Sequence, residues 1–382
     1  MKESNRIMFR IAGFVAIIGC ISMMLFPTIA LESAQKGVNL WAGVVLPALL
    51  PFFICANFMI AVGIPNLIGK FFEKPFQFFF GAPGCSAFIF IISITSGYPM
   101  GPKLIGDMRR RGEIALSEAK RMLTFCSTSG PLFMLGTVGV GMLHSPSAGA
   151  IITISHYLGA IFNGIIFHLL SKKEKQIYLN NNLRLKNKLI YEENSILELF
   201  TDAIISSLKT LGIICGYIII FTMITDFLEL TKAFASFQKY QIGIFKGLLE
   251  MTVGCNDLAL SEEISIQLKC VLATFLISFG GFSVLAQSMS VLYKSNISLW
   301  YYFKAKMMHG LIAGAIAYFL TPYLMSFSVN PVSNFGIRTW NFNPGMVAQL
   351  LFSTKMIIII MFMFAITIIV DYLIGRKETI QK

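Results

Sequence analysis

Ser96-Gly97-Tyr98-Pro99-Met100-Gly101-Pro102-Lys103 is a helix-breaking segment that follows the strongly apolar run 88–92. Glycine and proline interrupt regular helices. Irregular backbone at membrane depth is tolerated only where it is buried in protein or lines a cavity. The basic cluster 109–111 follows a few residues later. The combination predicts a broken intramembrane helix with a site for an anion beside it.

The composition of the whole chain predicts a membrane protein. The 382 residues are 55% hydrophobic and 13% charged, whereas soluble domains carry about 25% charged residues. The mean hydropathy is +0.72, and apolar segments of about 20 residues recur, which is the length that crosses a bilayer. We therefore expect an all-α polytopic membrane protein whose first partner is the lipid bilayer.

The net charge of +12 does not indicate a nucleic-acid partner. The basic residues gather in short loops between apolar segments, as the positive-inside tendency requires, and no zinc-finger or RNA-binding motif is present. The loops 103–121 and 171–190 hold the densest lysine and arginine. Both are expected to face the cytoplasm.

The sequence gives no sign of catalysis. The seven cysteines form no Cys-x-x-Cys pair and the four histidines form no His-Glu-x-x-His motif. P-loop, nucleophile-elbow and dinucleotide-binding glycine patterns are missing as well. We predict no catalytic residue, no metal, no cofactor and therefore no enzyme.

Two halves are expected on either side of the single long polar stretch. The predicted parts are an N-terminal helix over 1–37, a first repeat over 38–170, a cytoplasmic linker over 171–195 and a second repeat over 196–376. Residues 76–108 are predicted to form a re-entrant hairpin. Setting Gly97 on Gly281 aligns the two halves weakly, and inverted repeats with broken helices are typical of transporters.

Two segments of the first half are candidate substrate-binding sites. In the first, glycine lets backbone N–H groups approach a ligand and Lys103 adds a charge. In the second, hydroxyl groups beside a Gly-Pro pair can bind a carboxylate. The alternative for the first segment is a tight turn. The alternative for the second is a helix kink whose freed backbone groups are hydrogen-bonded by its own hydroxyls. The candidates are Ser96, Gly97, Tyr98, Pro99, Gly101, Lys103, Ser127, Thr128, Ser129 and Gly130.

The second half adds three weaker candidates. Glu250 has an apolar context, and an ionisable group at membrane depth is a functional candidate by default. It could bind a proton or Na⁺, or be a paired structural residue. Asn256 and Gln287 are further polar candidates.

These motifs together resemble the YlbJ (SpoVV) family of sporulation integral membrane proteins. Ser96-Gly97-Tyr98-Pro99 with Gly101 and the following basic run carries the resemblance, together with Cys126-Ser127-Thr128-Ser129-Gly130-Pro131. The resemblance implies a nucleoside-recognition Gate domain, similar to halves of concentrative nucleoside transporters. It also implies movement of dipicolinic acid, a planar dianion, across the outer forespore membrane.

Several functions stay open at this stage. The first is a transporter of a small anionic substrate, and the second is a nucleoside-type or other small-solute carrier coupled to an ion through Glu250. The third is a non-transporting scaffold, with other sporulation membrane proteins or a second copy of the chain as partners. Polar breaks in both halves favour transport, because a scaffold does not need them.

Overall fold

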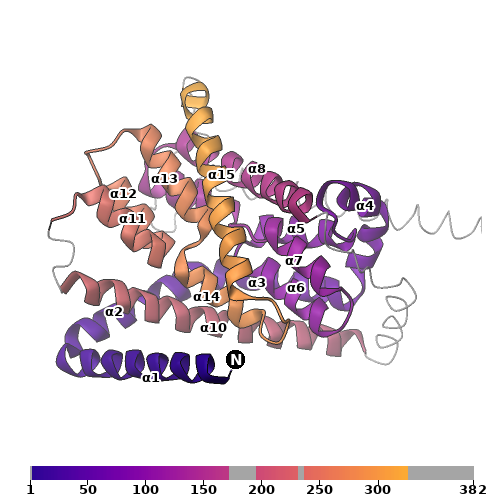
Figure 1. Cartoon of the computed structure of the whole chain (residues 1–382), viewed down its shortest axis with the longest axis horizontal. Helices are drawn as coiled ribbons and strands as arrows, with labels where there is room; N and C mark the ends of the chain where they lie inside the picture. The colour runs from indigo at the N-terminus through magenta and orange to yellow at the C-terminus, as the bar shows by residue number, and fades with distance from the viewer. Residues whose placement is uncertain (1, 172–194, 231–235, 326–382) are drawn as a thin grey trace, which may run out of the picture. The chain divides into compact units, whose positions relative to one another are not determined.

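The computed structural model describes residues 2–171, 195–230 and 236–325. All regular secondary structure in these ranges is helical, so the all-α prediction is confirmed (Figure 1). Most of the predicted linker 171–195, and the part of the second predicted repeat beyond 325, lie outside the described residues.

Four stretches of the described chain are long and apolar enough to cross a membrane. They are Pro146–Leu170, Ile196–Leu230, Ile266–Val291 and Leu299–Met325. Two bent helix pairs would raise the number to six if each pair makes one span. The chain is therefore a polytopic helical membrane protein.

The N-terminal segment holds two helices where one was predicted over 1–37. Helix α1 covers Lys2–Leu25 and α2 covers Pro27–Leu40. The chain bends by 109° between them. Pro27 lacks the N–H that would continue α1, yet its fixed φ suits the first turn of a new helix. A short π-helical segment, Trp41–Val45, leads into α3, Leu46–Ala61.

The first half continues with a series of short helices. These are α4 (Ile64–Phe80), α5 (Cys85–Ser96), α6 (Met100–Arg110), α7 (Leu116–Phe125), the π-helical segment η2 (Leu132–Met142) and α8 (Pro146–Leu170). A bend of 83° separates α4 from α5, next to Gly81, whose φ is +58°. The predicted break at Gly97 is confirmed, because α5 ends at Ser96 and α6 begins at Met100.

The second half shows a similar succession. It contains α10 (Ile196–Leu230), α11 (Lys239–Leu249), α12 (Met251–Ala259), α13 (Ile266–Phe279), α14 (Gly281–Val291) and α15 (Leu299–Met325). The predicted break at Gly280 is confirmed. A further break at Glu250, between α11 and α12, was not predicted.

The order of the helices recurs after about 150 residues. Helices α3 and α7 begin at Leu46 and Leu116, and α10 and α13 begin 150 positions later, at Ile196 and Ile266. These bounds favour a register that differs from the weak match of Gly97 with Gly281. Helix order is the stronger signal, because it matches α3 and α4 together with α10 and then α5, α6, α7, η2 and α8 in turn with α11 to α15.

Two groups of packed helices hold the described chain together. Helix α15 packs on α8 and α13, while α10 packs on α2 and α3 (Figure 1). Gly159 of α8 lies against Ala313 of α15, where an added Cβ would come within 2.7 Å of the alanine Cβ. Small residues at such crossings let backbones approach closely.

Candidate functional site

The helix breaks lie against one another in pairs. A Cβ placed on Gly97 would meet the backbone nitrogen of Gly130 at 2.7 Å, so the break at Gly97 touches the break at Ser127–Gly130. A Cβ on Gly281 would lie 3.1 Å from the carbonyl oxygen of Leu249, so the break at Gly280 touches the break at Glu250. Gly97 and Gly281 also have positive φ angles of +77° and +70°, which favour glycine.

Gly101 fixes how closely α6 approaches the second break. A Cβ at this position would stand 1.7 Å from the carbonyl oxygen of Cys126. No side chain fits there without moving backbone. The Ser93 hydroxyl donates to the same carbonyl at 2.8 Å and accepts from the backbone N–H of Thr128 at 3.2 Å. These contacts satisfy backbone groups that the break frees.

A buried polar cluster, formed by Tyr98, Ser127, His156, Lys306 and His309, lies beside these breaks. The Lys306 ammonium donates to the Tyr98 hydroxyl at 2.5 Å and to the carbonyl oxygen of Ser127 at 2.9 Å. Its nitrogen also lies 4.4 Å from the centre of the Tyr98 ring and 3.4 Å from His309 Nδ1. The cluster therefore joins α15 to both breaks of the first half.

The two histidines extend the cluster through α8 to the C-terminal end of α13, next to the break at Gly280. His309 Nε2 lies 2.9 Å from the carbonyl oxygen of His156. The backbone N–H of Ser129 donates to His156 Nε2 at 2.9 Å, and His156 Nδ1 lies 2.7 Å from the Ser278 hydroxyl. Four segments that are far apart in sequence thus share one hydrogen-bond network.

Further hydroxyls line the same region. The Ser127 hydroxyl lies 2.6 Å from the Tyr302 hydroxyl, and the Tyr157 hydroxyl donates to the carbonyl oxygen of Ser129 at 3.2 Å. The Ser96 hydroxyl instead bonds back to Ile92 within its own helix. Ser127 thus contributes its backbone carbonyl to the cluster, and of the predicted residues Tyr98 is the one whose hydroxyl contacts Lys306.

Burial makes the charge of Lys306 consequential. Its exposed fraction is 2%, and those of His309 and His156 are 1% and 0%. Among the described residues no ion pair includes Lys306. A buried ion that lacks a counter-ion costs several kcal/mol. An anion bound beside the Lys306 ammonium would supply the counter-charge that the described residues lack.

Sequence reasoning missed Lys306, His156 and His309. The available signal was an ionisable side chain inside an apolar span. Lys306 lies in the second turn of α15, after the exposed Lys304. The two lysines therefore resemble the basic flank of a span, and only the fold shows that one of them is buried.

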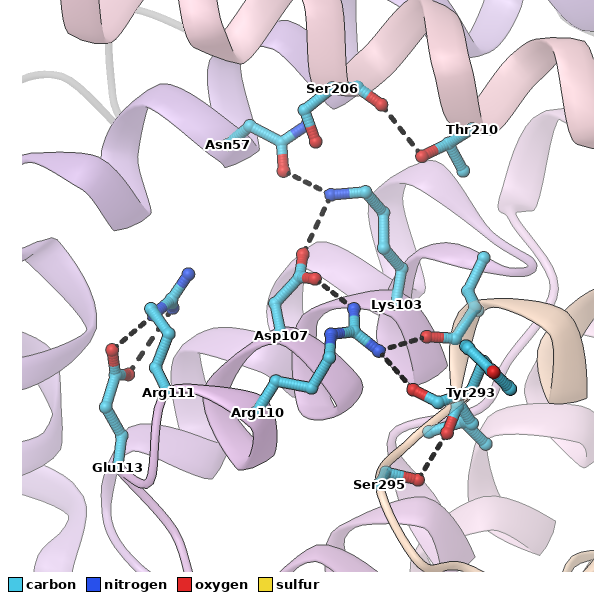
Figure 2. A network of polar contacts seen from close by, with 12 residues as sticks. Asn57, Lys103, Asp107, Arg110, Arg111, Glu113, Ser206, Thr210, Tyr293 and Ser295 are labelled. Carbon is cyan, nitrogen blue, oxygen red and sulfur yellow. Dashed lines mark hydrogen bonds and ion pairs between the residues drawn. The ribbon is translucent and has the colours of Figure 1, made fainter.

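Lys103 belongs to a separate network, shown in Figure 2. Its exposed fraction is 4%, and its ammonium donates to Asn57 at 2.7 Å and to Asp107 at 3.0 Å. Asn57 in turn donates to the Ser207 hydroxyl of α10 at 2.8 Å. The structure thus gives Lys103 a carboxylate partner and joins it to α3. Its predicted contact with a substrate stays a prediction.

Arg110 connects this second network to the other half of the chain. Its guanidinium donates to the carbonyl oxygens of Val291 and Tyr293, both at 2.9 Å, and pairs with Asp107 (Figure 2). These carbonyls lie at the C-terminus of α14, where helix carbonyls have no intrahelical partner. Arg111 pairs with Glu113 within its own loop.

The three candidates of the second half lie in different surroundings. Glu250 is buried, and its carboxylate accepts from the backbone N–H of Val253 at 2.9 Å, which caps α12. Burial raises the pKa of this carboxyl group. Asn256 is exposed. Gln287 is buried and donates to the Ser283 hydroxyl at 3.1 Å.

These features define a class: an all-α polytopic membrane protein whose broken helices enclose a cationic polar cluster. No family profile matches the chain, and no solved structure matches it. The sporulation integral membrane protein YlbJ of Bacillus subtilis (strain 168) is 29% identical over 324 residues, which cover 77% of this chain and 78% of that protein. The chain is therefore similar to this sporulation membrane protein over most of its length.

Proposed function

We propose that this protein is a sporulation membrane transporter that moves dipicolinic acid, an anionic dicarboxylate. The observation that carries the proposal is the buried Lys306 ammonium, which has no carboxylate partner among the described residues and lies where helix breaks meet. A dianion entering this region would supply the missing negative charge.

The polar interior supports transport over a scaffold role. Buried polar groups carry a desolvation cost unless they are hydrogen-bonded, and charged groups inside membranes mark substrate or ion pathways. A scaffold that displays only its surface gains nothing from a lysine and two histidines inside the bundle.

The proposed substrate and the proposed membrane rest on similarity to a known protein family. The Bacillus subtilis relative is named a sporulation integral membrane protein, and the family resemblance adds dipicolinic acid and the outer forespore membrane. The recurrence of helix order supports two Gate-like repeats, as in carriers built from inverted halves. Within this proposal, the predicted residues around Gly97 and Ser127 bound the substrate path.

Uptake of labelled dipicolinate into proteoliposomes tests the proposal. We expect uptake by the unaltered protein and a loss of at least about tenfold for Lys306→Gln, because a contact made by a charged group contributes about 1.5–3 kcal/mol. Lys304→Gln is the matched control, since it removes the same charge from an exposed position on the same helix.

Other outcomes would decide among the alternatives. Uptake of labelled uridine without uptake of dipicolinate would identify a nucleoside-type carrier. A well-folded protein that transports neither compound would contradict the proposal and favour a scaffold. Equal uptake by Lys306→Gln and the unaltered protein would remove Lys306 from the site.

A further inference from the structure

The hydrogen-bond network around Lys306 fixes which atoms carry protons. A backbone carbonyl only accepts hydrogen bonds, so the Ser127 carbonyl must accept from the amine. The His156 carbonyl likewise accepts from His309 Nε2. Nε2 of His309 therefore carries the proton of the neutral ring, and Nδ1 is left as an acceptor facing Lys306.

The Tyr98 hydroxyl supports the same assignment. It donates to the carbonyl oxygens of Ile277 and Ser278, at 3.2 Å and 3.4 Å. Its proton is thus directed away from Lys306, and its lone pair accepts from the amine at 2.5 Å. All three neighbours of the Lys306 nitrogen are acceptors. A protonated ammonium has three donors and no acceptor, which matches this arrangement.

His156 is neutral in the same network. Its Nε2 accepts from the backbone N–H of Ser129, so its Nδ1 carries the proton and donates to the Ser278 hydroxyl. Lys306 is then the group that supplies charge to this cluster among the described residues.

One acceptor of the ammonium, and the two carbonyls that Tyr98 bridges to it, belong to helix C-terminal ends. Ser127 follows directly after α7 and its C-cap residue Cys126. Ile277 and Ser278, which Tyr98 bridges to Lys306, lie in the last turn of α13. Helix C-termini carry partial negative charge. In transporters with broken helices, such ends together with unwound carbonyls coordinate the coupling Na⁺.

We infer that the ammonium of Lys306 is a tethered substitute for a coupling cation. It lies at the kind of position where a Na⁺-coupled carrier places its ion, with the unwound Ser127 carbonyl on one side and Tyr98, which contacts the C-terminal end of α13, on the other. A cation supplied covalently by α15 removes the need for a dissolved one. The site therefore works without Na⁺. The uptake test of this inference rests on the proposed transport function, whereas the unfolding test does not.

Thermal unfolding of the full chain in detergent tests the inference without any substrate. The unaltered protein and the control Lys304→Ala should unfold at the same temperature in sodium chloride and in choline chloride of equal ionic strength. Lys306→Ala should unfold at a lower temperature in choline. Sodium or methylammonium, which can enter the space left by the side chain, should raise it by at least about 2 °C, since binding to the folded state stabilises it.

Two results of the unfolding experiment would overturn the inference. The first is stabilisation of the unaltered protein by sodium relative to choline. The second is a Lys306→Ala variant that responds to neither sodium nor methylammonium. If Lys306→Ala cannot be purified in choline, its recovery as a folded protein in sodium or methylammonium counts in favour, and failure in all three media counts against.

Dipicolinate uptake by the unaltered protein supplies an independent readout. Rates should agree within about twofold between sodium and choline media, because no sodium ion takes part in the ion-coupled step. A strict requirement for sodium would overturn the inference. Absence of uptake in both media would contradict the proposed substrate instead, and the unfolding data would then decide the role of Lys306.

Discussion

Two buried lysines, Lys103 and Lys306, show how surroundings decide what a charge can do. Lys103 has Asp107 as an ion-pair partner and Asn57 as an acceptor. Lys306 has only uncharged acceptors among the described residues. A paired charge holds elements together, whereas a charge held by neutral groups keeps an electrostatic attraction for a mobile anion.

Glu250 provides a prediction at the residue scale. Burial raises the pKa of its carboxyl group, so the folded state holds the proton to a higher pH than the unfolded chain does. Stability is then lost as the pH rises through the folded pKa. Glu250→Gln keeps a capping oxygen and cannot ionise. The variant should match the unaltered protein at pH 4 and be more stable at pH 8.

The expected gain of Glu250→Gln is about 1.4 kcal/mol for each unit by which the pKa is raised. Chemical unfolding in detergent at a series of pH values measures it. Asn256→Asp on the exposed side of α12 is the control and should show little change. A Gln variant that is less stable at pH 8 would mean that the ionised carboxylate is needed as the cap.

At the scale of elements, the contact between α6 and α14 depends on Arg110. Its hydrogen bonds to the carbonyls of Val291 and Tyr293 tie the basic end of α6 to the C-terminal end of α14. Cations stabilise helix C-termini because these ends carry partial negative charge. Arg110, which lies in a basic loop expected to face the cytoplasm, therefore has a structural role as well.

Arg110→Ala should lower the stability of the folded chain by about 1–2 kcal/mol, because the lost bonds involve a charged donor that is partly exposed. Arg111→Ala removes the same charge from a loop pair with Glu113 and should cost less than about 0.5 kcal/mol. Denaturant unfolding of the two variants side by side measures the difference. Equal losses would show that net charge, and not the contact with α14, sets the effect.

At the scale of the whole molecule, the basic loops predict the orientation in the membrane. Cysteine substitutions at Arg111 and Asn181, in a background without native cysteines, place a label in each predicted cytoplasmic loop. A membrane-impermeant maleimide should label neither in intact cells and both in inside-out vesicles, as the positive-inside tendency requires. Labelling of the two loops from opposite sides would refute the predicted topology.

Much of the fold follows from local chain chemistry. The apolar segments predict the spans, and the breaks at Gly97, Ser127–Gly130 and Gly280 follow from glycine and proline, which disfavour the continuation of a helix. The break at Glu250 was missed because neither glycine nor proline marks it. A carboxylate cap on the next helix replaces that signal.

Local sequence is enough to predict a helical membrane protein and to place most of its helix breaks. Both properties depend on hydropathy and backbone preferences within a few neighbouring residues. The identity of the cation that lies at the breaks depends on how the helices pack. Lys306 reaches Tyr98 across 208 residues of chain, while Lys103 is neutralised by Asp107 four residues away. Burial and ion pairing are set by residues distant in sequence, so the charge left for a ligand emerges only when the helices pack.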